Sequence, residues 1–246
     1  MTRRFAHGVQ FGGAWTWSKA LDYGGEYGAY AQYASRRVWN YGESSTDRTH
    51  ILSINWLWAL PKASSLTNQF LVKTLFDDWR ISGIATFISG APTGIGFSET
   101  NGADLIGGGD GQRVNVTCNP QLSKGQQTFY EFFNTSCISA PVLGYIGNAD
   151  RIVFRGPGTE NFNMSLFRTF KVKERVTFEL RAETYNTFNH TQFTGVNTSA
   201  QFNPSGVQTN TAFGQFTSAA SPRYMQLAGR ITFERMIRRQ AGQRLP

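Results

Sequence analysis

The chain has 246 residues; 16% of them are charged, 14% are aromatic, 26 are glycine, and the formal net charge is +8. No segment approaches the roughly 18 consecutive apolar residues that mark a transmembrane helix, which excludes a helical membrane protein. Nucleic-acid binding is not indicated either, because Lys and Arg are scattered singly along the sequence and form no basic helical face or nucleic-acid module.

Two predicted strands open the chain, each with apolar residues at every second position. They cover residues 5–17 and 50–60, with Phe5, Val9, Phe11, Trp15 and Trp17 in the first and Leu52, Ile54, Trp56, Trp58 and Leu60 in the second. Alternation over about ten residues is typical of a transmembrane β-strand, whose apolar side faces lipid and whose polar side faces the lumen. Strands of soluble sandwiches also alternate, but they average about 5–6 residues.

Four more strands follow the same pattern, at residues 79–91, 162–172, 176–183 and 223–233. Ile84 and Ile88 weaken the pattern of the first, and Arg168 falls on the apolar side of the second. The last strand is the most regular, with Met225, Leu227, Gly229, Ile231 and Phe233 at alternate positions. The sequence therefore predicts an all-β fold: an antiparallel up-and-down transmembrane β-barrel fragment of about six long strands.

The connections between these strands alternate in length. Long polar segments cover residues 22–47, 92–160 and 191–222, whereas a tight turn lies at residues 173–175. The segment 61–78 is intermediate, and a start at Ser64 and Ser65 with apolar spacing after it predicts a short amphipathic helix. Long loops alternating with short turns are typical of outer-membrane barrels, in which the long loops are extracellular. On this interpretation the C-terminus lies in the periplasm.

Tryptophans occur where the aromatic girdles of such a barrel are expected. Trp15 and Trp17 fall at an outer strand end, while Trp56, Trp58 and Trp79 cluster at inner ends.

Five stretches of the sequence resemble the C-terminal barrel of Oar-like TonB-dependent receptors of the acidobacterial type. They are WTWSKALD (15–22), DRTH (47–50), DWRISGIATFISGAP (78–92), RGPGTENFNMSLFRTF (155–170) and RAETYNTFNHTQF (181–193). The resemblance covers residues 4–233 in the expected order. It implies an outer-membrane barrel of about 22 strands with a plugged lumen. It also implies energised uptake, in which an inner-membrane complex pulls on the plug through TonB.

The resemblance also implies the partners of the chain. These are outer-membrane lipid, the remaining N-terminal barrel and plug of the parent receptor, the TonB complex through that plug, and the barrel-insertion machinery. Met225, Leu227, Ile231 and Phe233 form the terminal-strand signal that this machinery would read, although 13 residues follow Phe233. We therefore expect a barrel segment at residues 1–233, a basic tail at residues 234–246, and a truncated product, because no signal peptide follows Met1.

The sequence predicts no catalytic site, no metal site and no cofactor. His7, His50 and His190 have no metal-ligand spacing and are interpreted as barrel-wall or loop residues. The glycine-rich residues 107–111 with Asp104 lack the carboxylates of a calcium loop and are interpreted as a flexible loop. Glu179, Arg181 and Glu183 are interpreted as lumen charges that compensate one another.

Two features are candidate sites. Cys118 and Cys137 are the only cysteines and lie in the longest loop, where a disulfide is expected, the alternative being two free thiols. The first loop is rich in aromatic and arginine residues, the types that form binding hot spots. They are Tyr23, Tyr27, Tyr30, Tyr33, Arg36, Arg37, Trp39 and Tyr41. They could bind a ligand or extend the aromatic girdle.

Three functional hypotheses follow. The first is a segment of a TonB-dependent outer-membrane receptor that supplies wall and loops for solute binding and uptake. The alternative is a non-transporting, adhesin-type surface barrel, and a third class is a soluble β-sandwich binding module.

Overall fold

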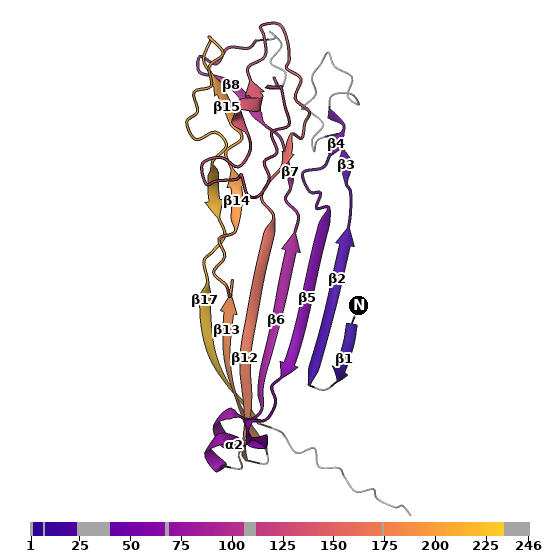
Figure 1. The fold of residues 1–246 in the computed structure, drawn as a ribbon, viewed down its shortest axis with the longest axis vertical. Helices are drawn as coiled ribbons and strands as arrows, with labels where there is room; N and C mark the ends of the chain where they lie inside the picture. Colours follow the sequence, from indigo (N-terminus) through magenta and orange to yellow (C-terminus); the bar gives the residue numbers. More distant parts are fainter. Residues whose placement is uncertain are drawn as a thin grey trace, which may run out of the picture.

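The computed structural model describes residues 2–6, 8–23, 40–66, 69–105, 112–173 and 175–233. Seven strands form one antiparallel sheet (Figure 1). Their order across the sheet is the same as their order along the chain. The strands are β1 (Thr2–Ala6), β2 (Val9–Trp17), β5 (His50–Ala59), β6 (Trp79–Ile88), β12 (Thr159–Lys173), β13 (Val176–Tyr185) and β17 (Tyr224–Phe233). The loops gather at one end of this sheet and the helix α2 lies at the other (Figure 1). The predicted up-and-down architecture is therefore confirmed.

The strand register places the apolar positions of all the long strands on one face of the sheet. Trp15 pairs with Leu52, which pairs with Phe87 on the next strand. At the other edge, Phe170 pairs with Phe178, which pairs with Ile231. Cross-strand partners point to the same side of a sheet, so these rows belong to a single surface, here called the apolar face. The opposite surface, here called the polar face, carries the residues between them, such as Ser53, Asn163 and Glu183.

The apolar face is not covered by a second layer formed by the described residues. Trp15 is 65% exposed, Leu227 is 79% exposed and Phe233 is 73% exposed. Such an apolar surface would be a liability in water, but it is the surface that a barrel presents to lipid. A β-sandwich would need a second sheet packed on this face, so the structure does not have the architecture of the soluble alternative.

The prediction of one strand over residues 5–17 was wrong at its N-terminal end. The chain reverses there, because β1 pairs antiparallel with β2 and Ala6 lies opposite Val9. Gly8 makes this turn possible with φ of +80°, a conformation that glycine adopts without steric cost. The sheet consequently has six long strands and one short strand at its edge.

Arg168 lies on the apolar face, but it is buried among aromatic rings. Its guanidinium lies over the Phe170 ring, 4.4 Å from the centroid, and 5.9 Å from the Trp79 centroid. Its Nη2 donates to the Lys73 carbonyl at 3.5 Å. Cation–π contacts and a helix carbonyl thus replace part of the water that the charge has lost, while its buried Nε has no hydrogen-bond partner among the described residues. The charge is tolerated because it lies at the strand end beside the helix.

The helix at this end begins later than the sequence predicted. Helix α2 covers Phe70–Phe76, whereas the predicted starting serines belong to a separate 3-10 turn at Ala63–Ser65. Ser64 donates two hydrogen bonds to the carboxylate of the buried Asp77, one from its N–H at 2.9 Å and one from its Oγ at 2.6 Å. The amphipathic character of the helix stays a prediction, because none of the residues of α2 is buried. None of the described helices is long and apolar enough to cross a membrane.

The two faces of the sheet should respond differently to a charge. Replacing Leu166 by Arg, near the middle of β12, should destabilise the membrane-inserted barrel by about 2–4 kcal/mol. Replacing the neighbouring Ser165 by Arg should cost much less, because Ser165 lies on the polar face and its Oγ is 3.4 Å from a Glu183 oxygen. Denaturant titration of the barrel in lipid measures both values, and equal costs would contradict the assignment of the faces.

Candidate functional site

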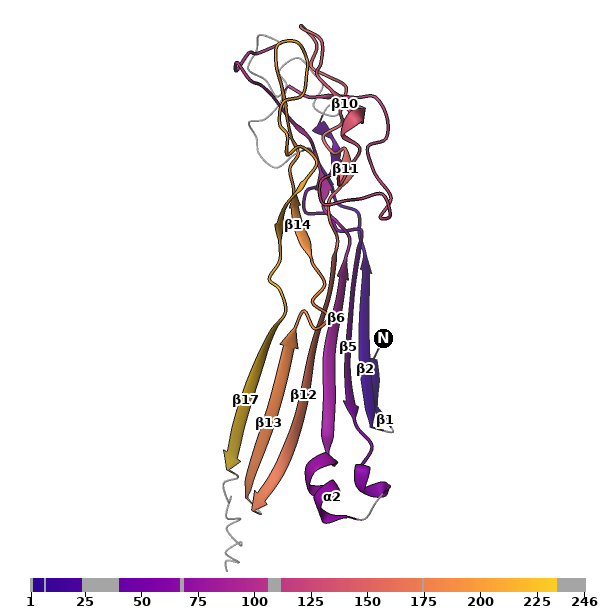
Figure 2. The ribbon, with the colours of Figure 1, turned by 60° about the vertical axis from the view of Figure 1, so that its left-hand side comes forward.

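The long loops fold into a compact cap at the end of the sheet opposite helix α2, the end expected to be extracellular (Figure 2). Their buried side chains form a hydrophobic core that draws on the segments after β6 and after β13. Its members are Val114, Phe132, Phe133, Cys137, Ile138, Ala149, Phe154, Ala200, Phe202 and Phe213. Phe133 is fully buried and its ring lies 4.5 Å from Phe154 and 5.2 Å from Phe213. The loops therefore present a defined surface.

Short strands join the loops to one another. Strand β8 (Gly96–Glu99) pairs in parallel with β15 (Ser199–Phe202), which connects two segments about a hundred residues apart. Strands β14 (Phe193–Val196) and β16 (Phe216–Ala219) pair directly above the wall. Main-chain hydrogen bonds thus connect distant loop segments within the cap.

The structure joins Cys118 and Cys137 by a disulfide, with their Cα atoms 5.1 Å apart. The bond lies beside β9 (Asn115–Val116) and β10 (Ile138–Ser139), which pair with each other. Cys137 is buried in the core of the cap. The disulfide therefore braces the cap and does not touch the barrel wall.

An ionic network ties the stem of the first loop to the cap. Arg155 donates to Glu43 at 2.7 Å and to Asp47 at 2.8 Å. Arg151 pairs with Asp22 at 2.5 Å and also donates to the carbonyls of Gly42 and Glu43. The stem strands are β3 (Leu21–Asp22) and β4 (Gly42–Glu43). Asp22, Asp47 and Arg155 come from three of the stretches that carry the family resemblance, and the fold brings them together.

Asp47 is the centre of this network. Its side chain is fully buried and accepts the Ala20 N–H at 2.7 Å. This backbone bond, together with the bond from Arg155, holds the pKa of Asp47 below its ordinary value, although burial opposes the shift. The carboxylate therefore stays ionised at neutral pH.

The candidate binding residues of the first loop are only partly described. Tyr23 and Tyr41 lie at the stem, where their rings are 5.2 Å apart and partly exposed. The other six, from Tyr27 to Trp39, lie outside the described residues. A ligand-binding role for this group stays a prediction.

The polar face carries a row of compensated charges. Arg181 lies between Glu179 at 2.9 Å and Glu183 at 3.4 Å, all on β13. Tyr185 continues the row, with its hydroxyl 3.3 Å from Glu183 and its ring stacked on Tyr224 at 4.5 Å. Each charge has an opposite partner, so the row suits a hydrated lumen wall and does not resemble an acid–base pair.

Within the described part of the chain, no group of three His, Cys, Asp or Glu side chains could hold a metal ion. His50 stacks on Trp15, with ring centroids 5.8 Å apart, and His190 contacts Gln192. Asp104 accepts from Gln112 at 2.7 Å, while residues 106–111 lie outside the described residues.

A single antiparallel sheet with one apolar face, aromatic residues at both ends and loops folded at one end defines a segment of an outer-membrane β-barrel wall. Comparison with protein families agrees, because the model of an outer membrane beta barrel domain matches residues 1–226. The chain belongs to this family, and its place is the outer membrane. No curated protein and no solved structure matches it.

Replacing Asp47 by Ala should loosen the cap. The Ala20 N–H and the Arg155 guanidinium lose their common acceptor, which should cost roughly 1–3 kcal/mol. Limited proteolysis of the barrel in outer membranes should then cut near residues 43–49 sooner. As a control, Asp150→Ala changes an exposed carboxylate of the same loops and should leave the digestion rate unchanged.

The same contact should depend on pH in one direction. Because the pKa of Asp47 is lowered on folding, its contribution to stability is complete above the unfolded value of about 3.9 and is lost as pH falls through the folded value. Cap proteolysis by an acid-stable protease should therefore accelerate only at strongly acidic pH, and this acceleration should disappear in Asp47→Asn.

The disulfide should stabilise the cap alone. It closes a loop with a sequence separation of 19, worth about 3 kcal/mol in the chain-entropy model. The double variant Cys118→Ser/Cys137→Ser should make the cap sensitive to protease while the wall keeps its resistance to denaturation. Thiol labelling that finds two free sulfhydryls in the unreduced, denatured protein would refute the bond.

Proposed function

We propose that the chain forms part of the wall and the extracellular cap of a TonB-dependent receptor of the Oar-like type. The observation that carries the proposal is the ionic network at the cap, in which Arg155 binds Asp47 and the neighbouring Arg151 binds Asp22. These residues belong to stretches that resemble that class, and their contacts give those stretches a common structural role. TonB would act only through the plug of the parent receptor.

The cap and the polar face have different tasks in this proposal. The cap anchors the stem of the first loop through the ion pairs of Arg151 and Arg155, and the tyrosines, arginines and tryptophan of that loop bind the solute. The polar face of the sheet lines the path of the solute. Its charged side chains favour hydration, and Arg181 partly compensates Glu179 and Glu183 there.

The alternative is a surface barrel that binds without transport. The folded cap supports it equally, because a rigid extracellular surface of loops also suits an adhesin. The two functions differ in their need for energy, so uptake that stops without TonB supports the receptor, and binding with no TonB-dependent uptake supports the alternative.

Alanine substitution of the first loop tests the binding role. Replacing Tyr27, Tyr30 and Trp39 together should abolish binding of a radiolabelled solute by cells while the amount of inserted barrel stays normal. The matched control is Tyr145→Ala, an exposed cap tyrosine outside this group, which should bind normally. Impaired insertion with unchanged binding per inserted molecule would instead assign the aromatic residues to the girdle.

The assay is a panel of solutes too large for general porins, measured in cells with and without working TonB. Accumulation that needs both TonB and the three aromatic residues is the expected result.

A further inference from the structure

A cleft of about 990 Å³ lies between the apolar face and the cap. Its floor includes Trp15, His50, Leu52 and Phe87, at the extracellular ends of β2, β5 and β6. The register places these residues on the apolar face, because Trp15 pairs with Leu52, Leu52 with Phe87, and His50 with Trp17. The cleft therefore opens on the lipid side of the wall, away from the lumen.

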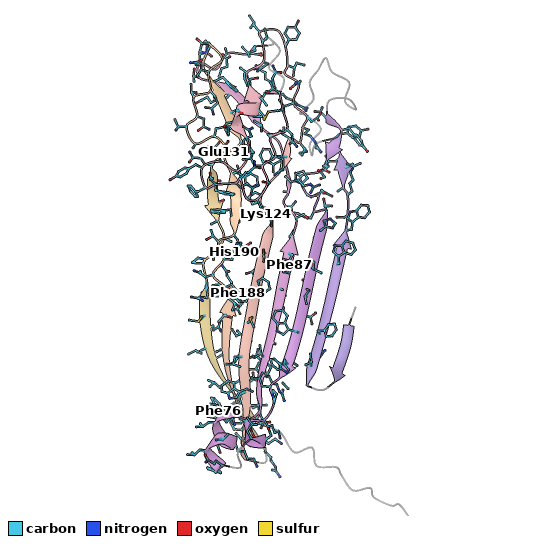
Figure 3. The ribbon with its side chains drawn as sticks, in the orientation of Figure 1. Phe76, Phe87, Lys124, Glu131, Phe188 and His190 are labelled. Carbon is cyan, nitrogen blue, oxygen red and sulfur yellow. A yellow bond between two sulfur atoms is a disulfide. The ribbon has the colours of Figure 1, made fainter. Side chains whose placement is uncertain are left out.

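The roof of the cleft is an overhanging loop, residues 121–129. Figure 3 shows Lys124 of this loop above Phe87, with His190 beside them. The loop is held in place at its start. Gln121 forms an isolated antiparallel β-bridge with Phe133, and the Arg155 N–H donates to the Gln121 side chain at 3.2 Å. At its far end Phe129 accepts the Phe216 N–H at 3.1 Å. The roof is thus part of the packed cap.

The cleft lies at the height of the outer lipid headgroups. Trp15 belongs to the outer aromatic girdle and pairs with Leu52 on β5. Trp58, of the inner girdle, lies six residues beyond Leu52 on the same strand. At about 3.3 Å per residue this is about 20 Å along the strand, comparable to the apolar band of about 25 Å. The hydrocarbon region therefore ends close to the floor of the cleft.

The lining combines flat aromatic rings with hydrogen-bonding and basic groups. Phe193 and Phe216 stack with centroids 3.8 Å apart, and Phe129 lies 6.1 Å from Phe193. Gln121, Gln127 and Lys124 add two amides and one ammonium group from the roof. Apolar clefts with a few convergent polar groups bind organic ligands, and ammonium groups near a membrane surface attract anionic headgroups.

We propose that this cleft binds the phosphorylated, sugar-bearing headgroup of an outer-leaflet glycolipid. The rings and amides contact the sugar, Lys124 contacts the phosphate, and the acyl chains follow the apolar face downward past Phe162 and Phe188. A transported solute is a poor occupant, because its path follows the opposite face. Strands that complete a barrel would join at β1 and β17, so they leave the front of β2, β5 and β6 open.

The test uses the barrel purified from outer membranes and vesicles of phosphatidylethanolamine that contain lipid A. Binding to these vesicles is compared with binding to vesicles that contain phosphatidylglycerol at equal charge. Lys124→Glu should weaken the binding of lipid A about tenfold. The matched control is Lys19→Glu, an exposed lysine at the extracellular end that does not line the cleft, and it should bind lipid A normally.

A second variant covers the possibility that charge reversal disturbs folding. Lys124→Gln removes the charge but keeps an unbranched polar side chain; it should still lose several-fold in lipid A binding, with unchanged heat resistance of the folded barrel on gels. Equal binding by the Lys124 and Lys19 variants would overturn the proposal. Equal binding to the phosphatidylglycerol vesicles and to the lipid A vesicles would overturn it as well, since the surface would then recognise negative charge alone.

Discussion

Backbone hydrogen bonding in a medium without water is the constraint on which the whole structure depends. An N–H or C=O group left unpaired in hydrocarbon costs several kcal/mol, so a chain that is not helical must cross the membrane as strands with lateral partners. The register meets this demand on both sides of the inner long strands β5, β6, β12 and β13. Strands β1 and β17 have a partner on one side only, so closure of the barrel in the membrane requires further strands beside them.

The same medium explains where the buried core lies. Lipid removes the advantage of burying apolar side chains inside the wall, because the hydrocarbon is as apolar as a protein interior. In water that advantage returns, and the residues from Val114 to Phe213 form a core above the membrane. The cap and the wall of one chain are therefore stabilised in different ways, the wall by its main chain and the cap by its side chains.

Charges are placed according to the same division. Asp47 is buried in the cap, where it accepts hydrogen bonds from a backbone N–H and from Arg155. On the polar face, Glu179 and Glu183 share the guanidinium of Arg181. Arg168 is the exception on the apolar face, where rings and the end of helix α2 shield it. At the cleft, loop residues of the cap approach the extracellular ends of strands on the apolar face.

The sequence determined the wall because its information is local. Alternation with a period of two assigns each residue of a strand to a face, and it placed Leu52, Phe178 and Ile231 correctly before any pairing was known. It predicted the number of long strands and the positions of the loops. It missed the reversal at Gly8, because a single turn glycine inside an alternating run does not disturb the period.

Only the tertiary structure decided the cap, the ionic network and the cleft. Arg151 and Asp22 are 129 residues apart, and Arg155 and Asp47 are 108 apart, so no local pattern links them. The alternating pattern gives no reason for a charge at Arg168 on the apolar face. The reason is found in its tertiary contacts with aromatic rings and with a carbonyl of helix α2. The cleft, likewise, combines an alternating strand with a loop that carries no period of its own. The physical reason is that loop packing depends on contacts between distant segments, whereas the face of a strand residue depends on its neighbours in the chain.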